Sequence, residues 1–541
     1  ILNNGLADGT RTLGLQLFNA IYPSEIGGIS ATTLSILDDE SLATIVTPPQ
    51  PVTVPETTPA TFSVVVDSAT TLSYQWFKGV DEIPGASLAT YTIPSTTLAN
   101  AGDYSVRITN SAGSFFSPVA ALTVLKSPSA LATGWAPSGP GAATLNGIVR
   151  AILPLPDGGA LVGGDFSLPQ RGIVRIDATG ARVSAFTLAL DSTAAGTGVH
   201  DILMDGEGRV YLAGRWDSIG GKTYANLVRL KPDFTIDDDF STALGTGPEG
   251  LVRDVSPDSN GGILIGGSFT RVNGLPGTAG FASISELGFL DRTLVSLAAI
   301  DVYRIARMPG SDKIYIGTST VGYASGTYII RLNPNGTRDF TFNPGNLNGA
   351  VRDFALRPDG GVVIGGAFTG TNAYLTSMLP SGAIDITFLP TVAIGGNVNS
   401  VATQPNGKFA IGGAFTTFGG TTNRFARVNA NGSLDKNLNL GTGFGGEVHR
   451  VAVAADGRLW IGGNFTQFKG ASATYLVRLH GDDVPTNILT QPQPQDVVAG
   501  TPASFTVTTT GTASPSFQWF KNGTPLTNGA NISGATTATL T

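Results

Sequence analysis

The side chains best suited to chemistry in this sequence recur at one position of seven similar segments. Each follows a valine and is polar: Arg150, His200, Arg253, Tyr303, Arg352, Asn399 and His449. If the seven segments line one cavity, these groups form a polar, partly basic ring that could hold an acidic sugar, a carboxylate or another anion. The alternative is that each side chain caps neighbouring backbone carbonyls. No nucleophile and base accompany the ring at a catalytic spacing.

A second candidate site is the acidic run Asp38, Asp39 and Glu40. Carboxylates are the hard oxygen ligands that Ca²⁺ prefers, but the ion needs about 6 to 8 oxygens, and three adjacent side chains cannot supply them all. The run therefore indicates either a calcium site completed by other residues or a plain acidic strand end. Calcium is the one cofactor that the sequence suggests.

Enzymatic chemistry has little support in the sequence. The chain has no cysteine and only three histidines, which excludes thiolate chemistry and disfavours a histidine triad or a zinc site. Glycoside hydrolysis needs paired carboxylates, but Asp157, Asp359 and Asp456 lie in turns that explain them. The glycine pair of "VVIGGAFT", residues 362–369, has no following helix to aim at a phosphate. We therefore expect no catalytic residues.

The elements that must position these residues form an internal repeat. A glycine pair, or a variant of it, recurs at intervals of 47 to 53 residues, at positions 163, 213, 266, 317, 365, 412 and 462. The unit at 351–388 holds four predicted strands: "VRDFAL", "VVIGGAF", one around "AYLTSML", and "AIDITF". Short strands in seven copies predict an all-β fold with a seven-bladed β-propeller, whose first strands line the central channel. The seven polar residues would then surround one mouth.

Two further patterns in the repeat are best explained by structure. The glycines are expected to give a neighbouring blade room, and the aromatic residues that follow are expected to fill the space between blades. Those aromatic residues are Phe166, Trp216, Phe269, Phe368, Phe415 and Phe465, and the fourth copy departs by placing Thr320 there. Cross-strand pairs eight residues apart are expected for Arg229 with Asp237, Arg331 with Asp339 and Arg427 with Asp435, and for Ser283 with Asp291 and Ser377 with Asp385. If exposed, each pair adds under about 1 kcal/mol.

The ends of the repeat array predict a closed ring. The last copy stops after its third strand, while a spare outer segment, "GWAPSGPGAATLNG" at 134–147, lies before the first copy. An outer strand contributed from the N-terminal side would close the last blade and leave no open edge.

Several segments resemble known families. "PDGGVVIGGAFT" and "RLNPNGTRDFTF" resemble the delta-60 repeat, which implies a propeller in large exported bacterial proteins. "YQWFKG" and "NAGDYSVRITNSAG" resemble an immunoglobulin-like domain, which implies a buried Trp76, a tyrosine corner at Tyr104, and Val64 and Val106 in place of the disulfide. "ISATTLSILDDESLATI" resembles the end of a Calx-beta domain. The expected domains are 1–46 (Calx-beta-like), 47–126 (immunoglobulin-like), 127–485 (propeller) and 486–541 (part of a second immunoglobulin-like domain).

Composition limits the choice of function. A net charge of -7 argues against a nucleic-acid partner, and no apolar run is long enough to span a membrane. We expect a modular extracellular structural or adhesive protein of the bacterial cell surface that contacts a protein or a surface glycan. A filament subunit that self-associates through incomplete terminal β domains is a variant of this expectation. The alternative is a carbohydrate-binding or carbohydrate-active propeller that uses the channel mouth.

Overall fold

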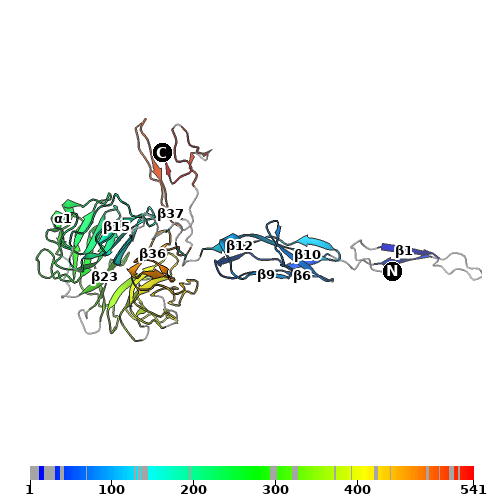
Figure 1. Cartoon of the computed structure of the whole chain (residues 1–541), viewed down its shortest axis with the longest axis horizontal. Coiled ribbons are helices and arrows are strands. Elements are labelled where there is room, and N and C mark those ends of the chain that lie inside the picture. The colour runs from blue at the N-terminus through cyan, green and yellow to red at the C-terminus, as the bar shows by residue number, and fades with distance from the viewer. Residues whose placement is uncertain are drawn as a thin grey trace, which may run out of the picture. The chain divides into compact units, whose positions relative to one another are not determined.

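The chain forms two compact units, Ile1–Ser127 and Pro128–Thr541. The computed structural model describes residues 11–16, 31–36, 42–68, 70–126, 130–131, 135, 144–192, 194, 196–292, 301–319, 327–345, 347–370, 373–390, 393–419, 424–438, 440–482, 487–498, 500–510, 517–521, 524–529 and 531–541. Within these ranges the chain is almost entirely β structure (Figure 1).

The first unit contains a hairpin and a β-sandwich. The hairpin pairs β1 (Arg11–Gln16) with β2 (Ala31–Ile36). The sandwich strands are β3 (Thr44–Thr47), β4 (Val52–Pro55), β5 (Ala60–Ser63), β6 (Val65–Asp67), β7 (Ser73–Lys78), β8 (Asp81–Glu82), β9 (Thr90–Ile93), β10 (Gly102–Asn110), β11 (Gly113–Phe116) and β12 (Ala120–Leu125). One sheet has the order β4-β12-β10-β7-β8, while β5 pairs with β9 and β3 with β6. This is the expected immunoglobulin-like arrangement.

The sandwich core confirms the roles expected from the immunoglobulin-like resemblance. Trp76 is fully buried, and its indole nitrogen donates to the carbonyl of Leu88 at 2.9 Å. The hydroxyl of Tyr104 donates to the carbonyl of Asn100, four residues upstream, at 2.8 Å, which is the bond that defines a tyrosine corner. Val64 and Val106 are both buried in the same cluster, so apolar packing stands where a disulfide would be.

Within the described residues the second unit contains seven antiparallel sheets of three or four strands, which we call blades 1 to 7 in chain order. Their strands are β13 (Ile148–Pro154), β14 (Ala160–Asp165) and β15 (Ile173–Ile176); β16 (Gly198–Met204), β17 (Val210–Arg215) and β18 (Leu227–Leu230); β19 (Val252–Pro257), β20 (Ile263–Gly267), β21 (Phe281–Ile284) and β22 (Leu290–Asp291); β23 (Val302–Arg307), β24 (Ile314–Thr318) and β25 (Ile329–Leu332); β26 (Val351–Leu356), β27 (Val362–Gly366) and β28 (Leu375–Met378); β29 (Val398–Thr403), β30 (Phe409–Gly413) and β31 (Phe425–Val428); and β32 (Glu447–Val453), β33 (Leu459–Asn464) and β36 (Leu476–Leu479). A small hairpin, β34 (Gln467–Phe468) with β35 (Ala471–Ser472), and one helix, α1 (Asp238–Leu244), lie outside the sheets.

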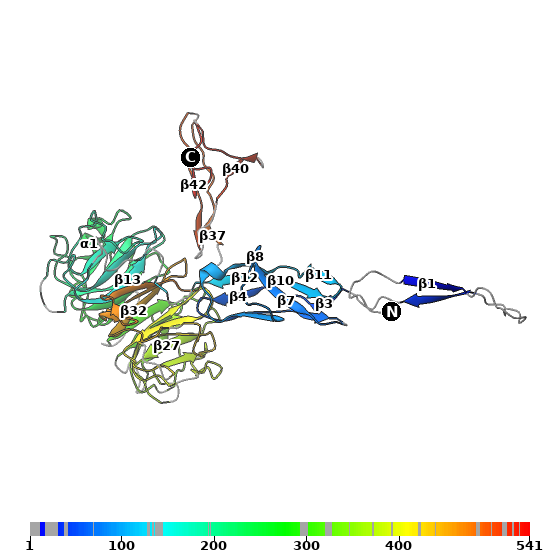
Figure 2. The same ribbon diagram turned by 45° about the vertical axis from the view of Figure 1, so that its right-hand side comes forward.

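The blades form a closed ring. Each first strand contacts the first strand of the next blade, and β32 of blade 7 contacts β13 of blade 1, beside it in Figure 2. The segment before blade 1 also reaches blade 7, because Leu131 bridges Leu479 and the ring centroid of Trp135 lies 5.1 Å from that of Trp460. The backbone bridge therefore lies N-terminal to the expected 134–147 segment, and residues 134 and 136–143 of that segment are outside the described ranges.

The glycine pairs separate two kinds of close contact. A Cβ on the first glycine would strike the next blade: at Gly365 it would lie 2.4 Å from Cγ1 of Val398, and at Gly462 2.3 Å from Cγ1 of Val149. A Cβ on the second glycine would strike the neighbouring strand of its own blade, 2.0 Å from the Ala350 carbonyl in the case of Gly366. These contacts support the interpretation that the glycines are needed for close packing of strands and blades.

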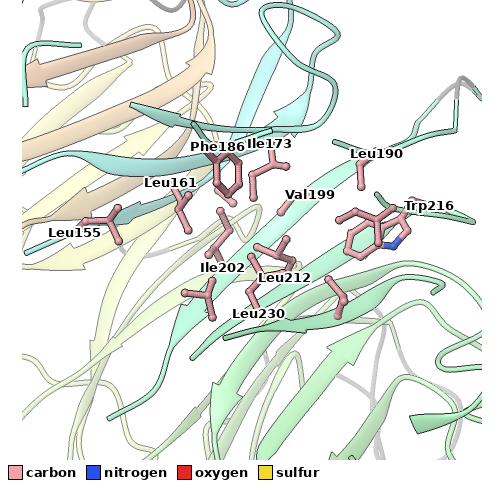
Figure 3. Close-up of a cluster of buried hydrophobic side chains, with 14 residues drawn as sticks. Leu155, Leu161, Ile173, Phe186, Leu190, Val199, Ile202, Leu212, Trp216 and Leu230 are labelled. Atoms are coloured by element: carbon pink, nitrogen blue, oxygen red, sulfur yellow. The ribbon is translucent and has the colours of Figure 1, made fainter. Parts of the chain in front are cut away.

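The apolar cores lie between adjacent blades. Figure 3 shows the cluster of blades 1 and 2, where side chains such as Leu161, Val199 and Leu212 meet. The predicted aromatic residues after the glycine pairs, Phe166, Trp216, Phe269, Phe368, Phe415 and Phe465, are all buried in such clusters. Thr320 of the fourth copy lies outside the described residues.

The predicted fourth strand is wrong for most blades. In blade 5 it is reduced to a single bridge between Met378 and Ile384, and among the described residues only blade 3 has a named fourth strand, β22. The reason is local. Asp385 accepts hydrogen bonds from the backbone and hydroxyl of Thr387, at 3.0 and 2.6 Å, and this turn diverts the chain from the sheet. Phe388 then enters the core.

The predicted arginine–aspartate pairs form, but they are buried. Nε of the arginine lies 2.9 Å from Asp237 for Arg229, 2.9 Å from Asp339 for Arg331, and 2.7 Å from Asp435 for Arg427. Ser283 faces Asp291 in register, whereas Arg357 bridges Ser377 and Asp385, with 2.7 and 2.5 Å bonds. Removing one partner from a buried pair leaves an uncompensated charge, so the small energy expected for exposed pairs does not apply.

The C-terminal part repeats local features of the sandwich. Its strands are β37 (Asn487–Thr490), β38 (Phe505–Thr506), β39 (Thr508–Thr510), β40 (Phe520–Lys521), β41 (Thr524–Pro525) and β42 (Thr539–Leu540). The indole nitrogen of Trp519 donates to the Thr537 carbonyl at 2.8 Å, much as Trp76 donates to a backbone carbonyl in the first sandwich. Val507 is buried, as Val64 is.

Candidate functional site

A β-bulge positions each of the seven predicted ring residues. In blade 5, Val351 pairs with Gly366 and Asp353 pairs with Gly365, so Arg352 between them is the extra residue. The same register shift occurs at the equivalent position of every other blade. A bulge changes the direction of a side chain. Here one polar residue per blade is the extra residue of a bulge and does not follow the regular alternation of side chains along the strand.

The bulged residues meet at one cavity of about 270 Å³, which we call the mouth cavity. Its lining contains all seven: Arg150, His200, Arg253, Tyr303, Arg352, Asn399 and His449. Asp254, Arg304, Asp353 and Arg450, each one residue further along its strand, complete the lining. The structure therefore brings together every ligand-binding residue expected from the repeat.

The ring is less basic than expected, because carboxylates that sequence reasoning missed lie beside the arginines. Nη2 of Arg150 is 2.6 Å from Oδ2 of Asp165, and Nε of Arg253 is 3.1 Å from Oδ1 of Asp301. Asp165 follows the glycine pair of its own blade, and Asp301 stands two residues before Tyr303, so the repeat alignment contained a signal for both. Two of the three arginines among the bulged residues are thus neutralised within the protein.

The third arginine among the bulged residues belongs to a chain of hydrogen bonds. Nη1 of Arg352 donates to Oδ1 of Asn399 at 2.6 Å, and Nδ2 of Asn399 donates to Glu447 at 2.7 Å. Nδ2 of Asn399 also donates to the carbonyl of Val448 at 3.0 Å. The carbonyl-capping alternative therefore describes Asn399, whereas Arg150 and Arg253 pair with carboxylates.

Below the ring, a second layer links the first strands of different blades. Nη1 of Arg304 lies 2.5 Å from Asp254 and its Nε 3.2 Å from Asp353, while Nη2 of Arg450 lies 3.0 Å from Asp201. The carboxylate of Asp254 also accepts the backbone N–H of Ile305 at 2.7 Å. Burial raises the pKa of Asp254 to about 7, against the opposing charge of Arg304. These pairs connect the first strands of blades that are distant in sequence.

Both histidines of the ring are neutral at neutral pH. Burial, followed by the charge of Arg150, lowers the pKa of His200 to about 3, although Asp165 lies 3.7 Å away. Burial also lowers the pKa of His449, against the raising effect of Glu447. The mouth cavity therefore offers neutral imidazoles between internally paired charges.

This pKa shift predicts a pH effect on stability. Because the folded pKa of His200, about 3, lies below the ordinary value of 6.5, the unfolded chain takes up the proton first as the pH falls. The folded state should then lose about 2 kcal/mol of stability between pH 7 and pH 5 through this residue. Urea unfolding of the wild type and His200→Gln at both pH values measures the difference. Equal losses in the two proteins would contradict the prediction.

Metal binding is not supported by the described residues, in which no group of three or more histidine, aspartate or glutamate side chains could hold an ion. Asp38, Asp39 and Glu40 lie outside the described ranges, so the calcium site there stays a prediction. No helix in the described part of the chain is long and apolar enough to cross a membrane.

Comparison with known families identifies the two main modules. The model of the "domain of unknown function (DUF5122) beta-propeller" matches residues 311–342, 404–437 and 454–485, and the immunoglobulin I-set model matches residues 486–541. The protein combines a β-propeller with immunoglobulin-like domains. The all-β class is thereby confirmed, whereas the delta-60 and Calx-beta assignments stay predictions.

Searches of whole proteins and solved structures add only local similarity. No curated protein matches the chain. A chimeric titin Z1Z2 structure that carries a KLER peptide from decorin is 32% identical over 16% of this chain and 97% of that chain, with a TM-score of 0.15. A mutant complex of titin M10 with obscurin-like 1 Ig is 26% identical over 16% of this chain and 98% of that chain, again with a TM-score of 0.15.

Proposed function

We propose that this chain is part of a modular extracellular protein with a structural or adhesive role at the bacterial cell surface. The observation that carries the proposal is the internal pairing of the mouth, where Arg150 and Arg253 are matched by Asp165 and Asp301. Charges that neutralise one another stabilise a rigid ring and leave little free charge for catalysis. The immunoglobulin-like domains then space and present the propeller, and no catalytic step is part of this proposal.

The location and the role are tested on the source bacterium. Antibodies raised against the propeller should label intact cells, and deletion of the gene should reduce attachment to a surface or to partner cells. Labelling only after permeabilisation would overturn the extracellular part of the proposal. Surface labelling with unchanged attachment would overturn adhesion and favour a structural role.

A second candidate function is carbohydrate binding at the mouth cavity. It is favoured by a buried polar atom of the cavity lining that lacks a hydrogen-bond partner in the described structure, Nε of Arg352. Because buried polar atoms normally have partners, a small polar ligand would satisfy it. A glycan-binding and hydrolysis screen tests this function, with Arg352→Ala expected to abolish any binding found. A blank screen would eliminate it.

A further inference from the structure

Four junctions between blades share a contact that the junction of blades 1 and 2 lacks. At four junctions a glycine of positive φ, in the turn after the third strand, lies directly against the outer segment of the preceding blade. The four contacts are Gly180 with Trp135, Gly288 with Phe240, Gly382 with Asn343 and Gly432 with Phe388, and a Cβ on each glycine would lie 2.4 to 3.0 Å from its neighbour. These junctions are closed at their outer edge because the turn carries no side chain.

Blade 2 carries phenylalanine at this position. Phe234 has a φ of 65°, and the turn around it is the one seen in blade 4, where Gly336 has a φ of 80°. In both turns the side chain before the positive-φ residue accepts a hydrogen bond from the backbone N–H after it. Thr235 N–H donates to Asp233 at 2.9 Å, and Thr337 N–H donates to Asn335 at 3.1 Å. A bulky residue at positive φ is disfavoured and persists only when its surroundings hold it there.

The side chain of Phe234 accounts for this conformation. Its ring meets that of Phe186, from the outer segment of blade 1, at a centroid distance of 6.1 Å and an interplanar angle of 86°. The guanidinium of Arg175 stacks over the ring of Phe234, 4.7 Å from its centroid. An aromatic wedge therefore stands between blades 1 and 2, where other junctions have a glycine contact.

The wedge borders a groove of about 800 Å³ between the two blades, which we call the blade 1–2 groove. Phe186, Leu188, Phe234 and Ile236 form its apolar floor and pack on the core cluster of Figure 3, where Phe186 is labelled. The remaining lining is rich in hydrogen-bonding groups: Arg175, Thr187, Lys222, Lys231, Asp233, Thr235 and Asp238. The groove thus combines an apolar floor with a polar rim of three cationic and two anionic side chains.

The rim can receive negative charge. Nζ of Lys222 lies 2.5 Å from Asp238, and Nη2 of Arg175 lies 2.8 Å from Asp157, in pairs that are partly exposed. Lys231 is exposed and forms no salt bridge within the described part of the chain. Exposed pairs exchange partners at small cost, so a ligand carboxylate can recruit these cations. Lys231, together with any cation released from its pair, can therefore receive a ligand carboxylate at the rim.

We propose that the blade 1–2 groove binds an acidic saccharide. A pyranose ring presents an apolar C–H face that suits the ring of Phe234, and its hydroxyls suit the threonine, aspartate and lysine groups of the rim. Its carboxylate would meet Lys231 and Arg175. The site is separate from the mouth cavity. This inference rests on the proposed function only in that an acidic saccharide would be the ligand of the adhesive role. Binding itself is measured on the purified chain, so its result does not depend on where the protein is located.

Calorimetric titration of the whole chain with tetragalacturonate tests the proposal, with maltotetraose and tetraglutamate as neutral and peptide controls. We expect binding of tetragalacturonate alone, weakened by salt, and a loss of at least about tenfold in affinity in Lys231→Ala and Phe234→Gly. Phe234→Gly should melt no lower than the wild type, because glycine suits the turn. Phe340→Gly, which removes an 81% exposed phenylalanine from blade 4, is the matched control and should bind normally.

Each other result would count against the site. No binding by the wild type would overturn the inference while leaving the surface role open, and equal binding of maltotetraose or tetraglutamate would overturn the acidic saccharide as the ligand. Unchanged affinity in Phe234→Gly would contradict the claim that the saccharide ring packs on the ring of Phe234. A large fall in its melting temperature with unchanged affinity would show that Phe234 has only a packing role.

Discussion

Replacing Arg427 by alanine is expected to destabilise the propeller by about 3 kcal/mol. The side chain of Arg427 is fully buried, with Nε 2.7 Å from Asp435 and Nη1 2.8 Å from Asp482 of blade 7. Its removal leaves the buried carboxylate of Asp435 with Lys408, whose Nζ lies 2.9 Å away, and the backbone N–H of Asn437 at 3.0 Å. It also breaks a link between blades 6 and 7. Urea unfolding followed by circular dichroism measures the loss.

Two further variants separate charge from packing in this experiment. Asp435→Asn keeps the shape of the pair but removes its negative charge, so it should also destabilise the protein. Arg271→Ala removes an exposed arginine from the same propeller and should change stability by less than about 0.5 kcal/mol. An Arg427→Ala protein that is as stable as Arg271→Ala would contradict the argument from burial.

The repeat made much of the propeller predictable, and its errors have local causes. The first two strands of the 351–388 unit appear at Val351–Leu356 and Val362–Gly366, close to the expected segments, because their alternation and turns agree with the sheet. The fourth strand failed because Asp385 bonds to Thr387 and competes with the ladder. A strand pattern read from hydrophobicity alone does not include that competition.

The candidate site was predictable as a position in the repeat but not as an electrostatic environment. One aligned column contained all seven mouth residues, yet Asp165 and Asp301 come from other columns and reach the mouth only through the fold. The blade 1–2 groove was missed for a different reason. Its signal is a departure from the repeat, because Phe234 stands where other copies have glycine. An alignment that looks for what the copies share does not single out a residue that differs.

The largest effect of a single added methyl group is expected at the second glycine of a pair. A Cβ on Gly366 would lie 2.0 Å from the backbone carbonyl oxygen of Ala350, the residue that directly precedes β26. Neither atom belongs to a flexible side chain, so relief requires the two strands to move apart at the bulge that positions Arg352. Overpacking of this kind costs about 3 kcal/mol.

Gly366→Ala should therefore unfold at lower urea concentration than the wild type and should perturb the mouth cavity as well as the stability. Gly206→Ala is the matched control, because a Cβ there has no neighbour within 4 Å. Alanine at such an open position is neutral or stabilises by up to about 1 kcal/mol, by restricting the unfolded chain. If the two variants proved equally stable, the second glycine would not be required by the neighbouring carbonyl, and its recurrence in the repeat would need another cause.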